Sequence, residues 1–327
     1  MTPDVLPLLV CPVCQAPLTL AADVKQGGRV DSGSLDCASC GRRVPIVRGI
    51  PRFESSDNYA TSFGLQWTTF RATQLDSHVG LPISHDRFFR QSRWSAAELA
   101  GKRVLDIGCG AGRFAEVALA AGARVVAIDY SAAVDACLAN LGANERLTVI
   151  QANVFQLPIK PGSFDYVYCF GVLQHTPDPH AAVLAMSAPL KRGGKLALDL
   201  YPRQAWNLLW PKYWVRPVTR RLQPERLFGI VSWLVPKLLP IGRTLAAVPV
   251  LGRRLRYVLP LTMYYQVFPF TSQQHREWAI LDTFDMLASR HDHPQTAAAV
   301  RKWLAEAGLR DVQAAREGLV VARAVKG

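Results

Sequence analysis

The chain has 327 residues, half of them hydrophobic, so it is long enough and apolar enough to build a full α/β core with small additions. It has no run of about eighteen uncharged apolar residues, so we expect no helix that spans a membrane. The formal net charge is +13 at pH 7, and the first residues lack the charged and apolar regions of a secretory signal.

Two Cys-x-x-Cys pairs stand near the N-terminus, with 22 residues between them. Each pair presents two thiolates to one ion, and together they complete a tetrahedral shell that leaves no open position for catalysis. The gap is long, and a hairpin tip that absorbs it is predicted from Gly27, Gly28 and Gly33. Disulfides in a secreted protein are the alternative, against which the missing secretory signal argues. We therefore expect structural Zn²⁺ on Cys11, Cys14, Cys37 and Cys40.

The residues around these cysteines, LLVCPVC at 8–14 and RVPIVRGIPRF at 43–53, resemble a small zinc-ribbon module. Such a module occurs as the activator subunit of some tRNA and protein methyltransferases. It is also fused to the front of many bacterial methyltransferases, so it does not by itself imply an RNA substrate. We expect residues 1–53 to form this module.

Residues 54–99 connect the module to the rest of the chain, and they are unusually aromatic for a linker. The run YATSFGLQW at 59–67 is the clearest example. One interpretation is a helix that packs an aromatic stripe on the core, and the other is a lid over a bound ligand. We expect Tyr59 and Trp67 to contact the substrate.

The stretch VLDIGCGAGRF at 104–114 is the most informative part of the chain. Its apolar start predicts a buried parallel strand at 104–107. Three alternating glycines then allow a sharp turn that brings a ligand close to bare backbone. A helix is predicted from residue 113, with its free N–H groups facing that ligand. The dinucleotide fingerprint spaces its glycines at 1, 3 and 6, but here the third glycine comes one residue early.

Two acids flank this turn in the sequence. Asp106 precedes the first glycine by two residues, where a carboxylate would repel a pyrophosphate but suits a cationic ligand. Asp129 ends the next predicted strand at 124–128, where it can take both hydroxyls of a ribose. The pattern therefore favours a nucleoside ligand that carries positive charge.

These motifs, DIGCGAG at 106–112 and AIDYS at 127–131, resemble the Rossmann-like S-adenosylmethionine-dependent methyltransferases, and the resemblance extends loosely over 275–327. In that family the glycine turn lies under the methionine part and sugar of the cofactor, and segments such as 54–99 often fold over it as a lid. QANVFQLP at 151–158 is similar to the family's third motif, with an amide in place of the usual acid. The resemblance implies S-adenosyl-L-methionine as cofactor, bound by Asp106, Gly108, Gly110, Gly112, Asp129, Tyr130, Asn153, Val154 and Phe170.

The resemblance also implies the fold, which we expect to be a seven-stranded doubly wound α/β sheet over 100–327 with its last strand antiparallel. A fourth strand from residue 163 leads into the loop that carries His175, beyond the carboxyl end of the sheet where ligands of open α/β sheets bind. We expect His175 to contact the substrate or act as base, and the alternative is a hydrogen bond that only holds the turn at Thr176. Tyr201 ends the fifth strand and is a candidate substrate contact.

An insertion at about 203–275 is expected to form a helical cap. Its part 203–260 holds 11 Lys or Arg and one acid, which is +10 of the net charge, and four of the eight tryptophans. Three interpretations stay open: a cap that covers the pocket, a cap that contacts an anionic membrane, and a nucleic-acid surface. Long apolar stretches between the cations favour the first two. The prolines predict that the cap is broken into short helices.

After the cap, the segment 281–296 resembles one in bacterial methyltransferases of sugar, glycan and natural-product pathways. Its candidate substrate contacts are Asp285, His291 and His293. A metal site or a simple helix cap would use the same residue types. A helix is predicted at 297–307 with Thr296 as its N-cap. The remaining residues predict a closing antiparallel hairpin with a break near Gly318.

We therefore expect a cytoplasmic enzyme, peripheral to the inner face of the membrane in one interpretation. It would transfer a methyl group to an oxygen of a small-molecule, glycan or lipid-linked acceptor by in-line displacement. The first alternative is an RNA or protein methyltransferase that docks through the ribbon and the basic cap. The second is a cofactor-binding regulator without catalysis.

Overall fold

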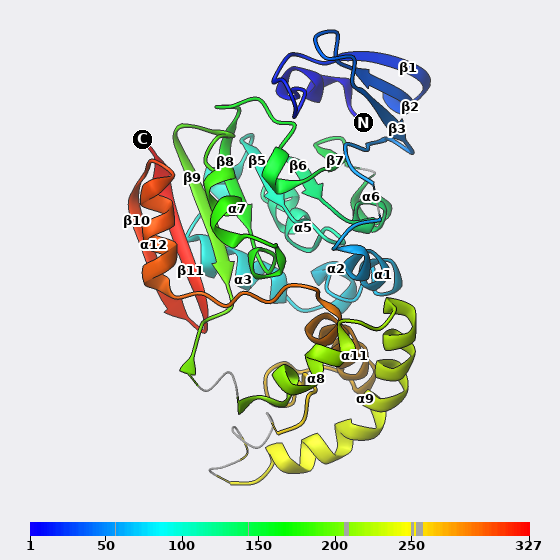
Figure 1. The fold of residues 1–327 in the computed structure, drawn as a ribbon, viewed down its shortest axis with the longest axis vertical. Helices are drawn as coiled ribbons and strands as arrows, with labels where there is room; N and C mark the ends of the chain where they lie inside the picture. The colour runs from blue at the N-terminus through cyan, green and yellow to red at the C-terminus, as the bar shows by residue number, and fades with distance from the viewer. Residues whose placement is uncertain (56, 143, 206–208, 250–251, 253–257) are drawn as a thin grey trace.

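The computed structural model describes residues 1–327 except 56, 143, 206–208, 250–251 and 253–257. Figure 1 shows a small N-terminal sheet, a central sheet layered between helices, and a helical cap at the opposite end. Among the described residues, none of the helices combines the length and the hydropathy needed to cross a membrane. Trp206, one of the four tryptophans of the insertion, lies outside the described part of the chain.

The N-terminal module is a four-stranded antiparallel sheet in sequential order, preceded by the 3₁₀ helix η1 (Pro3–Leu8). Gly27 and Gly28 form the predicted tip between its first two strands, and both have positive φ, as a two-residue hairpin turn requires. Gly33 lies inside the second strand instead, because its small size there lets the carbonyl oxygen of Ala21 approach. The strands are β1 (Thr19–Gln26), β2 (Arg29–Asp36), β3 (Arg43–Val47) and β4 (Ile50–Pro51).

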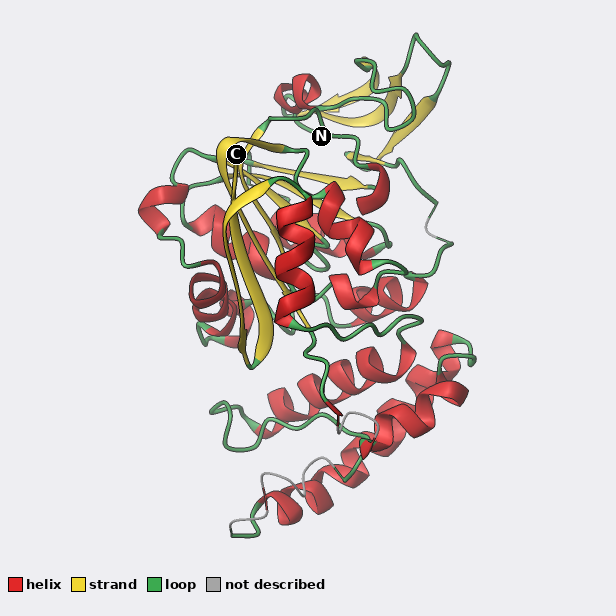
Figure 2. Cartoon of the chain, turned by 60° about the vertical axis from the view of Figure 1, so that its left-hand side comes forward, coloured by secondary structure: helices red, strands yellow, loops and turns green. Residues whose placement is uncertain are grey.

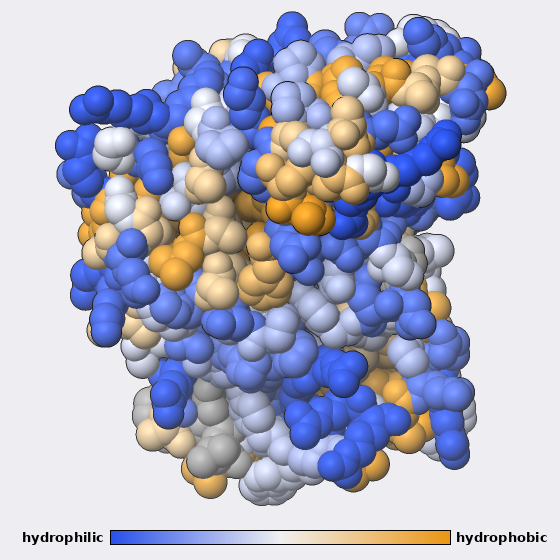
Figure 3. All heavy atoms as spheres, turned by 45° about the horizontal axis from the view of Figure 1, so that its top comes forward, coloured by the Kyte–Doolittle hydropathy of each residue, from blue (hydrophilic) through white to orange (hydrophobic). Residues whose placement is uncertain are grey.

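This module is docked on the edge of the central sheet. The Arg29 guanidinium donates hydrogen bonds of 3.1–3.3 Å to three backbone carbonyl oxygens near the last parallel edge strand, at Gly142, Asn144 and Leu147. The Arg52 side chain pairs with Asp135 at 2.8 Å, and its backbone forms a parallel β-bridge with Gln151 of that edge strand. The contact covers a strand edge that would otherwise be exposed. Figure 3 shows this end of the molecule, where apolar side chains occur in groups among hydrophilic ones.

The central sheet has seven strands in the order β10-β11-β9-β8-β5-β6-β7. All run parallel except β11, which pairs antiparallel with both β9 and β10, so the predicted fold class is confirmed. The closing hairpin turns at Gly318, as expected. The strands are β5 (Arg103–Ile107), β6 (Arg124–Asp129), β7 (Leu147–Gln151), β8 (Phe164–Cys169), β9 (Leu190–Leu200), β10 (Leu309–Glu317) and β11 (Leu319–Lys326).

Two apolar cores form on the two faces of this sheet, because alternate residues of each strand point to opposite sides. In β5, Leu105 belongs to the core under α7 and α12, and Val104 to the core under α3, α5 and α6. Thr296 caps α12 by accepting the N–H of Ala299, as predicted. The helices around the central sheet are α1 (Thr61–Thr69), α2 (Asp76–Val79), α3 (Ile83–Ser92), α4 (Ala96–Leu99), α5 (Arg113–Ala120), α6 (Ala133–Leu141), α7 (Pro179–Ala185) and α12 (Ala297–Glu306), with the 3₁₀ helices η2 (Val154–Gln156) and η3 (Leu173–His175).

The cap consists of α8 (Pro211–Thr219), α9 (Pro224–Ala246) and α11 (Ser272–Ala288), which share a third apolar core. Contrary to the prediction, prolines do not break it into short helices, since α9 runs through Pro236 and Pro240. Figure 1 shows α9 following a bent course, as expected for a helix that loses backbone hydrogen bonds at proline. Figure 2 shows α9 as the outermost helix of the cap. Packing of its apolar stripe on α11 outweighs the local cost of the prolines.

Candidate active site

A cavity of about 1200 Å³ lies between the carboxyl ends of the parallel strands and the cap. Its walls come from α1, the glycine turn, the ends of β6, β8 and β9, the start of α8, the segment 259–269, and α11. Eleven of the residues predicted for cofactor or substrate line it: Tyr59, Trp67, Gly108, Gly110, Asp129, Tyr130, Val154, Phe170, His175, Tyr201 and Asp285. The sheet therefore brings segments from distant parts of the sequence to one space.

The glycine turn forms the floor of this cavity. Gly108 and Gly110 have φ of +82° and +51°, a backbone region that side-chain-bearing residues rarely adopt. A Cβ on Gly108 would lie 2.4 Å from a methyl carbon of Val172, and one on Gly110 would lie 3.2 Å from the Trp67 ring. Bare backbone at these two positions is what lets Val172 and Trp67 approach the turn at the floor of the cavity.

The acid that ends β6 is held firmly at the rim of this turn. Asp129 Oδ2 accepts the N–H of Gly110 at 2.9 Å, and its Oδ1 accepts the N–H and the hydroxyl of Ser131 at 2.8 and 2.7 Å. Burial raises the pKa of Asp129. Three donors nevertheless fix the carboxylate in one orientation toward the cavity, as recognition of two vicinal hydroxyls would require.

Five of the predicted site residues lie outside the cavity lining: Asp106, Gly112, Asn153, His291 and His293. Asp106 is buried beneath the glycine turn, where burial raises its pKa to about 8. Its Oδ2 has no hydrogen-bond partner among the residues that the structure describes. Gly112 directly precedes α5, and a Cβ there would lie 2.6 Å from Leu141. Asn153 caps η2 by accepting the N–H of Phe155, so its amide oxygen already has a partner.

The aromatic linker segment forms α1, which packs against α6 and also lines the cavity. Gly64 allows this close packing, since a Cβ there would lie 3.3 Å from Ala132. The ring of Tyr59 lies 4.9 Å from that of Tyr130, and Trp67 covers Gly110. The two interpretations of this segment therefore describe two sides of the same helix.

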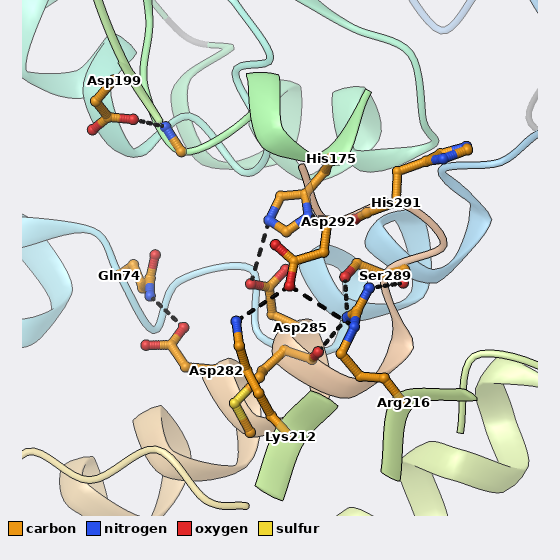
Figure 4. Close-up of polar contacts among 12 residues, drawn as sticks. Gln74, His175, Asp199, Lys212, Arg216, Asp282, Asp285, Ser289, His291 and Asp292 are labelled. Atoms are coloured by element: carbon orange, nitrogen blue, oxygen red, sulfur yellow. Dashed lines mark hydrogen bonds and ion pairs between the residues drawn. The ribbon is translucent and has the colours of Figure 1, made fainter. Parts of the chain in front are cut away.

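His175 lines the cavity from the end of η3 (Figure 4). Its Nδ1 is 3.1 Å from the backbone carbonyl oxygen of His291, which only accepts hydrogen bonds, so Nδ1 carries the proton. The other ring nitrogen, Nε2, is buried, lacks a hydrogen-bond partner in the described residues, and lies 3.9 Å from Asp285 Oδ2. In the neutral ring, the lone pair is then on Nε2, the nitrogen that faces Asp285.

Three partly buried acids lie near this histidine, two on α11 and one after it. Burial raises the pKa of Asp285, and burial together with the Asp285 charge raises the pKa of Asp282 to about 7. Asp282 accepts hydrogen bonds from Gln74 at 3.2 Å and from the Tyr264 hydroxyl. Asp292 follows the helix and pairs with two cations from α8, as described next.

Two cations of the basic cap point inward (Figure 4). Lys212 Nζ lies 3.2 Å and Arg216 Nε 3.8 Å from Asp292 Oδ2, and all three side chains are buried. Arg216 also donates to the backbone oxygens of Met286 and Ser289. These contacts hold the segment whose His291 carbonyl fixes His175. Sequence reasoning missed this network, although the spacing of Lys212 and Arg216 by one helical turn predicts a shared face.

A second network missed from the sequence lies on the other side of the cavity. Arg87 on α3 pairs with the buried Asp199 of β9 at 2.6 Å, and Asp199 also accepts the N–H of Gly171. Arg113 at the start of α5 donates to Gln74 and Ser84, and burial lowers its pKa to about 9. The sequence feature that could have indicated this network is the arginine directly after the glycine turn.

The four N-terminal cysteines converge beyond the end of the β1–β2 hairpin that lies opposite Gly27 and Gly28. Sγ atoms are 3.5 Å apart for Cys11 and Cys40, 3.4 Å apart for Cys14 and Cys37, and all four lie within 4.8 Å of one another. These distances exceed a disulfide bond of about 2.0 Å and are near the edge of about 3.8 Å expected for a tetrahedron with metal–sulfur bonds of about 2.3 Å. The cluster therefore has the donor set and the spacing of a structural zinc site.

Two family models match the chain. One, described as a methyltransferase domain, matches residues 105–198, and the other, described as Trm112p-like protein, matches residues 2–49. The chain is 35% identical over 182 residues to the ubiquinone biosynthesis O-methyltransferase of Ralstonia nicotianae, covering 54% of this chain and 76% of that protein. It is 42% identical over 109 residues to the protein of the same name from Xanthomonas euvesicatoria, covering 32% of this chain and 46% of that protein, less than half of its length.

A solved structure of a magnesium protoporphyrin IX methyltransferase from Synechocystis PCC 6803 with bound SAH is similar at 18% identity and a TM-score of 0.40, over 75% of this chain and 84% of that chain. The strand order and the glycine turn at the carboxyl ends of the strands define a Rossmann-like α/β protein with a nucleoside site. With the sequence matches, the chain belongs to the S-adenosylmethionine-dependent methyltransferases and carries a Trm112p-like module at its N-terminus.

Proposed function

We propose that this protein transfers the methyl group of S-adenosyl-L-methionine to a hydroxyl oxygen of an apolar, ring-bearing small molecule. The observation that carries the proposal is one cavity that joins the glycine turn to the buried pair of His175 and Asp285. Aromatic side chains of α1, α8 and the segment 259–269 line the remainder of that cavity. The relatives named ubiquinone biosynthesis O-methyltransferase support an oxygen acceptor of this class.

The residues fit the cofactor in two ways. Gly108 and Gly110 present bare backbone to the cavity, and Asp129 presents a fixed carboxylate for ribose hydroxyls. Asp106 supplies an orphaned buried carboxyl beneath the turn, which suits the positive charge of the methionine part. When bound, S-adenosyl-L-methionine supplies an electrophilic methyl group on a sulfonium. The chain's own task is to align the acceptor with it and to remove a proton.

His175 is the base in this proposal. Its Nε2 lone pair would take the hydroxyl proton of the acceptor, which makes the oxygen a better nucleophile toward the electrophilic methyl group that the cofactor would supply. Asp285, 3.9 Å away, stabilises the imidazolium that forms. The carbonyl of His291 holds the ring throughout, because Nδ1 keeps its proton. Tyr201 and Phe63 pack on the imidazole and exclude water from it.

The cysteine cluster holds one Zn²⁺ in this proposal and has a structural role, since four thiolates leave no open position. The docked ribbon supports that role, because Arg29 and Arg52 tie it to the methyltransferase core of the same chain. Metal analysis of the purified protein by mass spectrometry tests it: one zinc per chain is expected, and metal-free protein with an intact ribbon would overturn it.

One observation favours the alternative of an RNA or protein acceptor, namely the match to a Trm112p-like protein. In this chain, however, two of the cap cations that would form a docking surface are buried on Asp292. A methyl-transfer assay with hydroxylated aromatic acceptors, with and without ribonuclease-treated extract, separates the two. Activity on a purified small phenol supports the proposal, and activity that requires RNA or protein overturns it.

A further inference from the structure

The outer helix of the cap, α9, has two apolar sides. One side carries Leu227, Val231, Val235 and Leu239, which are buried against α11. The other carries an exposed apolar stripe, centred about 120° around the helix from the buried one at 100° per residue. This outer stripe consists of Ile230, Trp233, Leu234 and Ile241, and Trp233 is 63% exposed. Packing of the cap explains the first side but not the second.

Cations lie on the same side of α9 as the outer stripe. Arg226 and Lys237 fall within its angular range, both are exposed, and Lys237 Nζ stands 3.4 Å from the centre of the Trp233 ring. Glu225 is the one acidic residue in 203–260. The outer stripe therefore combines an exposed tryptophan, aliphatic side chains and two cations without an ion pair in the described part of the chain. This is the composition of helices that lie in the headgroup region of a bilayer.

The neighbouring helix α8 buries charged side chains and exposes apolar ones, the reverse of an ordinary surface helix. Its cations Lys212 and Arg216 are buried in the ion-pair network, whereas Trp214 and Val218 are 65% and 64% exposed. A cap that faced only water would show the opposite arrangement. Inversion of α8 and the outer stripe of α9 are independent observations, and both place apolar side chains on the exterior of the same cap.

We infer that the cap docks on the surface of an anionic lipid bilayer, with the outer stripe of α9 in the headgroup region. Charge complementarity selects this occupant, because exposed Arg226 and Lys237 would pair with anionic headgroups while Trp233 and Ile230 enter the apolar boundary. A second copy of this chain would bring like charges together on the two stripes. Docking at the cap would leave the ribbon, at the opposite end in Figure 1, away from the membrane.

Vesicle flotation with the full-length protein tests this inference. Vesicles of phosphatidylcholine with about 30 mol% phosphatidylglycerol should carry the protein upward at low salt, and vesicles of phosphatidylcholine alone should carry far less. The double variant Ile230→Ser/Trp233→Ser should bind at least about tenfold more weakly. Val24→Ser, an exposed apolar position on the ribbon strand β1, is the matched control and should bind as the unchanged protein does.

A charge variant keeps the test informative if the apolar variant fails to fold. Arg226→Gln/Lys237→Gln should weaken binding to anionic vesicles about tenfold and reduce its sensitivity to salt. The inference is overturned if the unchanged protein does not float with anionic vesicles, or if both double variants float as it does. It is also overturned if sedimentation shows a dimer that Trp233→Ser dissociates, since the stripe would then join two copies. Flotation needs no methyl transfer, so this outcome is independent of the proposed function.

Discussion

Replacing His175 with glutamine is expected to lower kcat by about 10²- to 10⁴-fold, which is the range that a positioned general base contributes. The side chain keeps a similar volume between Phe63 and Tyr201 but loses the basic Nε2. Because the proposal assigns His175 to the acceptor and not to the cofactor, the affinity for S-adenosylhomocysteine should change less than about twofold. The assay is steady-state transfer of labelled methyl groups to a phenolic acceptor, with calorimetry for the cofactor product.

The contribution of Asp285 follows from its distance. An imidazolium and a carboxylate 3.9 Å apart attract each other by about 4 kcal/mol at an effective dielectric constant of about 20, an upper bound that corresponds to roughly 10³-fold in rate. Lys212 and Arg216 nearby already offset part of the Asp285 charge. We therefore expect Asp285→Asn to lower kcat by about 10- to 100-fold, less than the change at His175.

His180→Gln is the matched control for these variants. That histidine is on α7, where its Nε2 lies 3.1 Å from Glu306 at the surface, away from the cavity. Its loss should leave kcat within about twofold of the unchanged enzyme. The reasoning is refuted if His175→Gln retains more than half of the activity with an unchanged pH profile, because another group would then take the proton.

Three further predictions concern the cofactor site and the ribbon. Gly110→Ala should weaken S-adenosylhomocysteine binding by at least about tenfold in calorimetry, since the backbone there has φ +51° and the new methyl group would lie 3.2 Å from Trp67. Unchanged binding would contradict a cofactor site at the glycine turn. Affinity for S-adenosylhomocysteine should rise with pH up to about 8 and then level off, because the raised pKa of Asp106 means that the carboxyl must lose its proton to receive a cationic amino group. Calorimetry in buffers of different ionisation enthalpy should show proton release on binding below pH 8. An affinity that does not change with pH, and that Asp106→Asn leaves unaltered, would count against this role of Asp106. Cys11→Ser should abolish zinc retention and lower the unfolding temperature of the ribbon in a thermal scan, whereas Cys169→Ser, at a cysteine outside the cluster, should retain the metal.

Local features of the site could be predicted from the sequence. The glycine turn, the acid at the end of β6 and the four cysteines each lie in short motifs whose geometry depends on backbone conformation nearby. The sheet order with its antiparallel last strand followed from the same motifs through family resemblance. Each motif is short, so one sequence contains enough information to recognise it.

Features that depend on distant segments could not be predicted. His175 meets Asp285 because α11 crosses over η3, and Lys212 turns inward because Asp292 lies buried opposite it. The sequence showed the positive charge of the cap but not which cations face solvent. Helix α9 continues through its prolines because tertiary packing on α11 outweighs local propensity. The cofactor contact of Asn153 stays a prediction, and the sequence did not show that its amide oxygen also caps a local turn.

The most direct test of the central claim is transfer of labelled methyl groups from S-adenosyl-L-methionine into a cell extract that is then separated into organic, small-aqueous, RNA and protein fractions. The cavity and its buried His175 predict label in the organic or small-aqueous fraction, and loss of that label with His175→Gln. Label confined to RNA or protein would contradict the account and make the ribbon a docking module for a macromolecular acceptor.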